Sequence, residues 1–307
     1  MALRQLMHLQ HTGPIREFHL ISEGHKLALS DVDAYLIFVS KHGIQKLTLD
    51  LADVEEYFEL PYSVFTCSTL THLKLSRFFF SRRLRRHIAF PEHVSLQLEH
   101  SEIVLSEDIL TLPMLETLKF SFCSRVKLGD TAFPKLKILS IISSHSLTFH
   151  SFRTSKFKSV THLFLDGDSL ATLGWYHVPK SLDEPLNLQS LKIYDLQISV
   201  KPISCALCLL RNSPNLYELD IDEAVKVDET STQSQTTELF SYVSNEQNHV
   251  DEALREIRTV RLGKFKGSRS EMYFIEVLLA HSPKLERMIV EQCKESSNML
   301  ADAARKC

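Results

Sequence analysis

The pattern L-x-x-L-x-L recurs along this sequence, with other aliphatic residues or Phe allowed, and it constrains the fold more than any other feature. Eleven matches begin at Ile15, Ile44, Leu70, His93, Leu115, Leu136, Val160, Leu188, Leu216, Ile257 and Leu285. His93 is the one polar residue at a first position, and every fourth and sixth position is apolar. Such self-similarity predicts a repeat architecture, in which each repeat buries its apolar face only against its neighbours.

Each match predicts one short strand with a buried face. The fourth and sixth positions are apolar and the third and fifth are mostly polar, which is the period of two residues typical of a half-buried strand. Successive matches start 29, 26, 23, 22, 21, 24, 28, 28, 41 and 28 residues apart. Since leucine-rich repeats have a period of about 20 to 29 residues, we predict an α/β leucine-rich-repeat solenoid of about eleven repeats. Its strands should form a parallel sheet that lines the concave side.

The stretches between the strands predict helices in several repeats. Residues 30–43 carry Ser30 or Asp31 as a helix cap and Gly43 just beyond the expected end. The apolar face of this helix would be Tyr35, Leu36 and Val39. Residues 206–221 recur as 277–290, and each copy places Ser-Pro between an apolar run and the next strand. Because proline cannot continue a helix, we read both copies as helix, stop and strand.

One spacing of 41 residues marks an insertion between Glu223 and His249. Its central sequence KVDETSTQSQTT is polar and acidic and has no apolar period. Few apolar anchors are present to offset the entropy cost of ordering this segment. We therefore predict a mobile polar loop or linker here, with residues 226–248 as its most mobile part.

Composition excludes several classes of protein. Lys and Arg number 35 against 38 Asp and Glu, so a net charge of -3 gives no overall field that would recruit nucleic acid or an anionic membrane. The longest apolar stretches, such as residues 34–39, are far shorter than the roughly 20 residues of a membrane-spanning helix. The first residues do not resemble a signal peptide, and the six Cys show no disulfide spacing. We expect a cytoplasmic or nuclear protein that binds no membrane.

The sequence contains none of the common motifs of catalysis or cofactor binding. Only 8 Gly occur, and we find no phosphate-binding loop, G-x-G-x-x-G, H-E-x-x-H or G-x-S-x-G. Cys205 and Cys208 have the spacing of half a zinc or redox site, but they lie in an apolar run where Cys behaves as a small hydrophobic residue. His8 and His11 have no carboxylate or Cys beside them. We expect a protein that is not an enzyme and that takes no cofactor or metal.

Three phrases of the sequence resemble successive landmarks of plant F-box proteins that carry leucine-rich repeats and an FBD domain. They are HTGPIREFHL at residues 11–20, LPYSVFTCSTLTHLKL at 60–75 and FIEVLLAHSPKLERMIV at 274–290. Together with the repeat pattern, the resemblance implies a solenoid at 1–222, a polar loop or linker at 223–252, an FBD-like segment that continues the repeats at 253–292 and a tail at 293–307.

The resemblance also implies a function. Members of this family normally carry an F-box, a helical module of about 40 residues that docks onto the adaptor of cullin-type ubiquitin ligases. Because only ten residues precede His11, we expect this chain to lack the F-box and not to join a ligase unless one is supplied upstream. The implied function is substrate recognition for ubiquitination. The alternative is a free-standing scaffold that binds protein partners without ubiquitin transfer.

The strand positions that alternate with the buried ones predict a partner-binding face. Third, fifth and seventh positions should face the concave side, where solenoid proteins bind their partners. In three consecutive repeats these positions include apolar residues, which with a charged rim resemble a protein interface. The candidate anchors are Ile138, Ile142, Phe164 and Tyr194, and the candidate rim is Lys119, Asp166, Lys192 and Asp220. The alternative is that a loop of the solenoid itself covers these side chains.

A second candidate surface is the basic segment 76–90, where arginines surround three consecutive Phe. Its cations are Arg77, Arg82, Arg83, Arg85 and Arg86. Basic residues interleaved with aromatic ones bind nucleic acid or acidic partners in other proteins. The rest of the chain is acidic and no nucleic-acid-binding motif accompanies the segment. We therefore favour a convex-side segment with solvated arginines, and we keep nucleic-acid binding as a further alternative.

Overall fold

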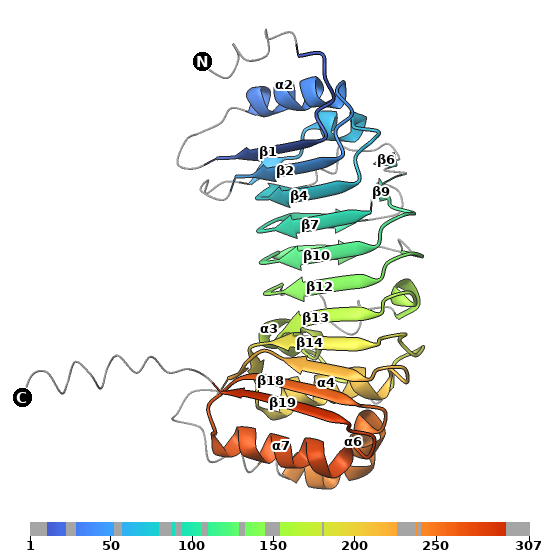
Figure 1. The fold of residues 1–307 in the computed structure, drawn as a ribbon, viewed down its shortest axis with the longest axis vertical. Coiled ribbons are helices and arrows are strands. Elements are labelled where there is room, and N and C mark those ends of the chain that lie inside the picture. The colour runs from blue at the N-terminus through green and yellow to red at the C-terminus, as the bar shows by residue number, and fades with distance from the viewer. Residues whose placement is uncertain are drawn as a thin grey trace, which may run out of the picture. The chain divides into compact units, whose positions relative to one another are not determined.

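The computed structural model describes residues 11–22, 29–51, 57–79, 88–89, 92, 94–105, 110–128, 133–144, 154–179, 181–225, 238 and 241–292. Eleven strands form the main sheet, and their order in the sheet follows their order in the chain (Figure 1). They are β1 (Glu17–Ile21), β2 (Lys46–Asp50), β4 (His72–Ser76), β7 (Ser95–Glu99), β10 (Thr117–Ser121), β12 (Ile138–Ile142), β13 (His162–Asp166), β14 (Ser190–Tyr194), β16 (Glu218–Ile221), β18 (Thr259–Phe265) and β19 (Arg287–Gln292).

Each of these strands coincides with one match to the repeat pattern, and all the strand pairs given below are parallel. The α/β class and the large parallel sheet predicted from the sequence are therefore confirmed, and they are compatible with a leucine-rich-repeat solenoid. The number of leucine-rich repeats stays a prediction.

The chain divides into two compact units, which we describe separately. Unit 1 comprises Met1–Leu163 with Trp175–His177, and unit 2 comprises Phe164–Gly174 with Val178–Cys307. The domain boundaries at 222, 252 and 292 stay predictions. In the part of the chain that the structure describes, we find no helix of sufficient length and apolarity to span a membrane.

In unit 1 the fourth positions of successive repeats pair with one another and form the core. Leu73 lies beside Leu96, Leu96 beside Leu118, and Leu118 beside Leu139. None of the four side chains is more than 2% exposed. Identical register in each pair stacks the apolar positions into one continuous row, as expected when each repeat covers the face of its neighbour. The edge strand β1 has one strand neighbour, and its residues Phe18 and Leu20 are only half-buried while Ile21 is exposed.

The helix α2 (Leu29–Ser40) confirms the first of the predicted returns. Tyr35, Leu36 and Val39 are buried, and Gly43 adopts the left-handed conformation, with φ of 72°, that favours glycine after a helix. The helix begins at Leu29, so Ser30 and Asp31 lie inside its first turn and do not form the cap that the sequence predicted. The 3₁₀ helix η1 (Tyr62–Thr66) packs beside α2.

Further parallel strands follow the main strands of unit 1 after a sharp corner. They are β3 (Phe58–Glu59), β5 (Phe78–Phe79), β8 (Glu102–Leu105) and β11 (Arg125–Leu128) in one sheet, and β6 (Ile88–Ala89) and β9 (Leu110–Thr111) in another. The corner residues Arg77, His100 and Phe122 have φ of 65°, 44° and 55°. Each occupies the eighth position of its repeat, and a positive φ is uncommon for residues other than glycine.

Buried hydroxyl groups hold these corners in place. Ser101 Oγ accepts a hydrogen bond from Phe78 N at 3.2 Å and donates one to Glu99 O at 2.8 Å. Ser144 Oγ does the same for Cys123 N at 3.2 Å and Ile142 O at 3.0 Å. These bonds pair backbone groups that the turn would otherwise leave buried and unsatisfied.

Unit 2 adds helices to its strands (Figure 1). They are α3 (Gly167–Leu173), α4 (Val200–Arg211), α6 (Gln247–Leu254) and α7 (Arg269–His281), accompanied by the short strands β15 (Leu196–Gln197) and β17 (Ala224–Val225). Both predicted copies of helix, Ser-Pro stop and strand are present, as α4 with β16 and as α7 with β19. A reciprocal cap starts α7, in which Ser268 Oγ accepts from Glu271 N and the Glu271 carboxylate accepts from Ser268 N.

The structure differs from the predicted polar loop at 223–252. Residues 241–245 are helical and α6 begins at Gln247, while Val243 and Val250 are only 6% and 0% exposed. Each of these two helical stretches buries a valine, so a mostly polar segment still contributes to the core. Of residues 226–248, those at 226–237 and 239–240 lie outside the described part of the chain, and their predicted mobility stays a prediction.

Candidate interaction face

Three predicted site residues come together on the sheet face of unit 2. Lys192 Nζ on β14 lies 3.1 Å from Asp220 Oδ2 on the neighbouring strand β16, and both residues occupy the fifth position of their repeats. The same Nζ lies 5.1 Å from the ring centroid of Tyr194, within the range of a cation–π interaction. The side chains of Lys192 and Asp220 are 21% and 17% exposed. The pair is therefore partly shielded from water and salt.

Arg261 and Glu291 extend this pair across two further strands. Arg261 Nη1 on β18 donates to Asp220 Oδ1 at 3.3 Å. Its Nη2 and Nε donate to the two carboxylate oxygens of Glu291 on β19, at 2.8 and 3.3 Å. Bonding to Glu291 and the charge of Asp220 raise the pKa of the Arg261 guanidinium above its ordinary value. We call Lys192, Asp220, Arg261 and Glu291 the ion-pair row.

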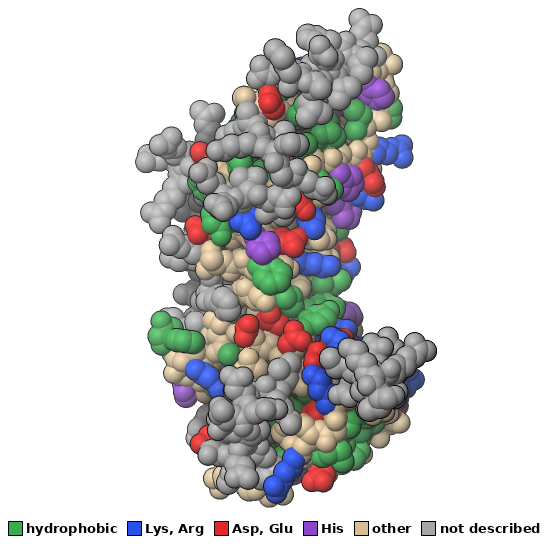
Figure 2. Space-filling view, turned by 90° about the vertical axis from the view of Figure 1, so that its left-hand side faces the viewer, with side chains coloured by type: hydrophobic (Ala, Val, Ile, Leu, Met, Phe, Trp, Pro, Cys, Tyr) green, Lys and Arg blue, Asp and Glu red, His purple; other side chains and the backbone are tan. Residues whose placement is uncertain are grey.

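The ion-pair row gives the face a fixed pattern of alternating charge. Arginine supplies donors in a planar fork, so Arg261 binds Glu291 at two points and keeps a further donor for Asp220. Each pair at this exposure contributes about 1 kcal/mol or less, so the row adds little to the stability of the fold. Figure 2 shows that positive and negative side chains are interspersed on the face of the molecule that it displays.

The other unit 2 candidates differ from each other in exposure. Phe164 on β13 is half-buried, as expected for an outward-facing strand position. Asp166 is 5% exposed and caps α3, because its Oδ1 accepts a hydrogen bond from Ser169 N at 2.9 Å. The prediction of Asp166 as a solvent-facing rim residue is therefore corrected: the start of a helix directly after β13 draws its side chain into the backbone of that helix.

The remaining candidates lie in unit 1, on one face of two neighbouring strands. Ile138 and Ile142 on β12 are half-buried, and Lys119 on β10 pairs in register with Ser140. Lys119 and the two isoleucines occupy the positions that alternate with the fully buried Leu118 and Leu139. Their outward placement agrees with the prediction. Their role as partner-binding residues stays a prediction.

Of the basic segment, the structure describes Arg77 alone among the five arginines. Arg77 is a corner residue, and its carbonyl accepts a hydrogen bond from Phe58 N at 2.9 Å. Arg82, Arg83, Arg85 and Arg86 lie outside the described residues. Phe78 is fully buried, so part of the aromatic run belongs to the core of unit 1.

A second group of charges lies at the strand ends of unit 2. Lys264 Nζ is 3.2 Å from carboxylate oxygens of both Asp222 and Glu223, and Lys266 Nζ is 2.6 Å from Glu223. Hydrogen bonding to Lys266 is the main cause that lowers the pKa of Glu223. Burial raises the pKa of nearby Asp195, and the charge of Glu223 adds to this effect. Sequence reasoning missed this group because its members come from different repeats.

Cys205 and Cys208 lie inside α4, with side chains that are 0% and 3% exposed. Burial raises the pKa of the Cys205 thiol to about 12 and that of Cys208 to about 11. Both thiols are therefore uncharged near neutral pH, whereas a thiolate is the form that binds metal or attacks a disulfide. Their burial supports the interpretation of these residues as small hydrophobic side chains of the core.

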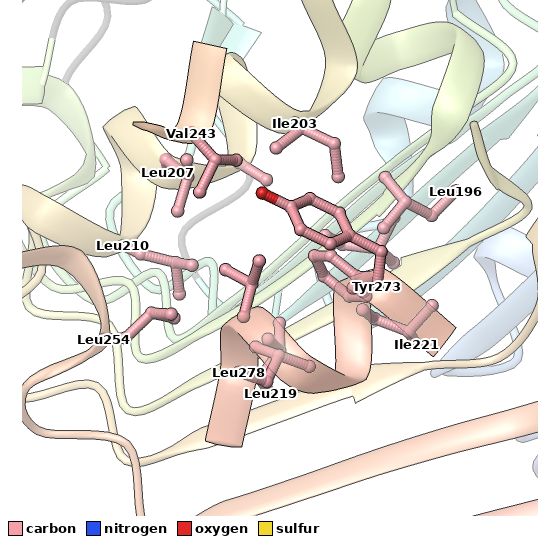
Figure 3. Close-up of a pocket in the computed structure, with 14 residues that line it drawn as sticks. Leu196, Ile203, Leu207, Leu210, Leu219, Ile221, Val243, Leu254, Tyr273 and Leu278 are labelled. Atoms are coloured by element: carbon pink, nitrogen blue, oxygen red, sulfur yellow. The ribbon is translucent and has the colours of Figure 1, made fainter. Parts of the chain in front are cut away.

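A cavity of about 20 Å³ lies in the core of unit 2, among side chains of α4, α6, α7 and the strands (Figure 3). Every lining side chain is apolar except for the hydroxyl of Tyr273, which points towards the side where Val243 lies. A space of this size holds about one water molecule, and cavities with apolar walls stay dry. The cavity is a packing gap and not a site with the groups that catalysis requires.

Comparison with known proteins agrees with the repeat pattern. No protein-family model matches the chain. An F-box/FBD/LRR-repeat protein of Arabidopsis thaliana is 29% identical over 320 residues, which cover 92% of this chain and 74% of the relative. The chain is thus similar to this plant F-box/FBD/LRR-repeat protein over most of its length. The resemblance noted from three phrases of the sequence is thereby confirmed over nearly the whole chain.

Proposed function

We propose that the chain is a protein-recognition module whose outward strand face selects a partner for ubiquitination, as the substrate-binding part of an F-box ubiquitin-ligase subunit. The observation that supports this most directly is the combination in unit 2 of an aromatic side chain with the ion-pair row. Tyr194 lies beside Lys192, and aromatic residues next to ordered charges are the usual anchors of protein interfaces.

The chemistry of the face favours a protein partner over a small molecule. The paired charges run across four strands, and a partner with the complementary pattern would add contacts without leaving a buried charge unpaired. In the described residues we find no group of three or more His, Cys, Asp or Glu placed to hold a metal ion. The name of the Arabidopsis relative, which combines an F-box with leucine-rich repeats, points to the same kind of function.

Capture of partners from plant extract tests the proposal. The double variant Phe164→Ala with Tyr194→Ala should lose a partner that wild type retains, because truncating a true interface anchor costs about 2 kcal/mol or more. Tyr217→Ala is the matched control, since Tyr217 is an aromatic residue of the same unit, 45% exposed, at a second position of the repeat and off the strand face. Equal loss in the control, or no loss in the double variant, would contradict the proposed face.

The ligase connection has its own test. If the chain works in a ligase, a partner lost from the double variant should be ubiquitinated and should accumulate when the proteasome is inhibited in plant cells. The second candidate is an interaction scaffold with no role in ubiquitination. A partner that binds the same face but shows no ubiquitination and no change in abundance favours this scaffold. Nucleic-acid binding through residues 76–90 is a third candidate, tested by the effect of Arg83→Ala with Arg86→Ala on retention by a single-stranded oligonucleotide.

A further inference from the structure

The last described helix and strand of unit 2, α7 and β19, both expose apolar side chains (Figure 1). Met272 and Leu279 on α7 are 45% and 55% exposed, and Val290 on β19 is 43% exposed. The same order of helix, Ser-Pro stop and strand occurs 69 positions earlier in the chain, where the equivalent side chains are buried. These are Ile203, Leu210 and Ile221, which are 3%, 5% and 1% exposed. The later copy therefore lacks a contact that the earlier copy makes.

The earlier copy is buried because the elements that follow it in the chain pack on it. Ile203 and Leu210 of α4 line the apolar cavity together with Leu254 of α6 and Leu278 of α7 (Figure 3). This face of α4 is thus the face on which the following helices lie. Among the described residues no helix or strand follows β19, so the same face of α7 has no described element packed on it. Repeat proteins need a cap or a partner at such an end, because each repeat contacts only its neighbours.

The strand β19 also presents unpaired backbone groups. It is the last of the described strands in the main sheet, and it pairs with β18 on one side. Arg287 N donates to Arg258 O at 2.9 Å, and successive residues of a strand direct their backbone groups to opposite sides. The N–H and C=O groups of Met288 and Val290 therefore point towards the open edge of the sheet. Open edges of this kind pair with strands of other chains.

The sequence of β19 is complementary to itself in the antiparallel direction. When two copies of β19 pair around Ile289, Arg287 lies opposite Glu291 of the partner subunit. Met288 then lies opposite Val290 of the partner subunit. Because these two residues carry the outward backbone groups, each such pair exchanges both of its backbone hydrogen bonds. Opposite charges directly across two strands stabilise the pairing, whereas a shifted register would place one of the charges opposite Ile289 of the partner subunit.

Both charges are available for this contact. Arg287 is exposed and forms no ion pair within the described part of the chain. The exposed carboxylate of Glu291 accepts from Arg261, and its oxygens have capacity for a further donor. A two-fold interface requires one surface that fits itself, and the end formed by α7 and β19 meets this requirement in charge, in hydrogen bonding and in apolar area.

We propose that the C-terminal end of unit 2 binds a second copy of this chain. In this dimer β19 pairs antiparallel with β19 of the partner subunit, and α7 packs against α7 of the partner subunit with Met272 and Leu279 in the interface. Because Glu291 also belongs to the ion-pair row, the dimer brings the rows of two copies next to each other. A partner protein with two binding segments then gains affinity without any new kind of contact. The proposal concerns self-association and does not rest on the proposed function.

Sedimentation velocity of the full chain, from about 1 to 100 μM, tests the charge contact. Wild type should form a reversible dimer with twice the mass of the 35.2 kDa chain. Arg287→Glu and Glu291→Arg each place like charges opposite one another, so each variant alone should dimerise at least about tenfold more weakly. In an equimolar mixture of the two variants every charge again faces its opposite, and the heterodimer should regain the affinity of wild type. Arg255→Glu, at an exposed Arg that ends α6, is the matched control and should dimerise as wild type does.

The apolar contact has its own variant. Leu279→Gln should weaken the dimer about tenfold or more, because the interface loses one apolar side chain from each copy. Its Tm at a concentration where wild type is monomeric should stay unchanged, since Leu279 is 55% exposed in the single chain. Ile37→Gln, at a 45% exposed position of α2 in unit 1, is the matched control.

The proposal is overturned if wild type stays monomeric at every concentration, which is the result expected if residues 293–307 of the same chain cover this end. A mixture of Arg287→Glu and Glu291→Arg that stays monomeric also overturns it. Dimers of Arg287→Glu or Leu279→Gln that are as tight as those of wild type would place the contact elsewhere on the molecule. Assemblies that grow beyond a dimer would show a head-to-tail contact in place of the two-fold one.

Discussion

Replacing Leu118 by alanine gives a quantitative test of how the repeats hold together. Leu118 is fully buried and pairs in register with Leu96 on one side and Leu139 on the other. Leu118→Ala removes three carbon atoms, which corresponds to about 2.4 kcal/mol of lost burial at about 0.8 kcal/mol for each. The cavity left in the row adds to this loss, so the free energy of unfolding should fall by about 2 to 5 kcal/mol.

Urea denaturation followed by circular dichroism measures this effect. With a slope of about 2 kcal/mol per molar, the midpoint should move down by about 1 to 2.5 M urea. Lys119→Ala is the matched control, because Lys119 is the next residue on the same strand and faces outward. Combining Leu118→Ala with Leu139→Ala should give a non-additive loss, since the two side chains share one cavity, whereas Val260→Ala in unit 2 should add to it independently.

The inward assignment of the fourth position would be refuted by a clear result. That result is a Leu118→Ala variant that unfolds at the same urea concentration as wild type, together with a Lys119→Ala variant that loses more stability. A second refutation would be simple additivity of Leu118→Ala with Leu139→Ala, because side chains in one continuous apolar row cannot lose their contacts independently.

Two further predictions concern pH. Because hydrogen bonding to Lys266 lowers the pKa of Glu223 in the folded state, this carboxylate stabilises the fold above its unfolded pKa of about 4.5, and the stabilisation is lost as the pH falls below that value. Glu223→Gln should therefore lose less stability than wild type between pH 5 and pH 3.5, measured as the shift of the urea midpoint. Some loss remains in both proteins, because bonds to lysines also lower the pKa of Glu17 and Glu256. An equal loss in the two proteins would contradict the assignment. Burial raises the pKa of Cys205 to about 12 and of Cys208 to about 11, so folding favours the uncharged thiols, and stability should decline from about pH 9 upward. Both thiols should react with iodoacetamide at pH 8 only as fast as the protein unfolds. The variants Cys205→Ala and Cys208→Ala identify which thiol is labelled. Rapid labelling of either thiol in the native protein would show that it is exposed.

The local features were predictable because they depend on residues close in the sequence. Alternation of apolar and polar positions placed all eleven strands, and Ser-Pro marked the ends of α4 and α7. Periodicity predicts such elements because each repeat has only one way to bury its two apolar strand positions. The polar segment at 223–252 was the failure, since one buried valine in α6 and one in the preceding helical turn join it to the core.

The site was predictable only in part, because its chemistry arises between strands. The sequence alone determined that the side chains of Lys192, Tyr194 and Asp220 share a face, because side chains alternate with a period of two residues along each strand. Only the tertiary structure decided that Arg261 bridges Asp220 and Glu291, because these residues lie 41 and 30 positions from it in the chain. Likewise, the stacking of the His100 and Phe122 rings depends on left-handed corners in register, which no local pattern of side chains specifies. The sequence determined the repeat, and the parallel pairing of repeats decided which charges and rings come together, because strand spacing brings residues of separate repeats within contact distance.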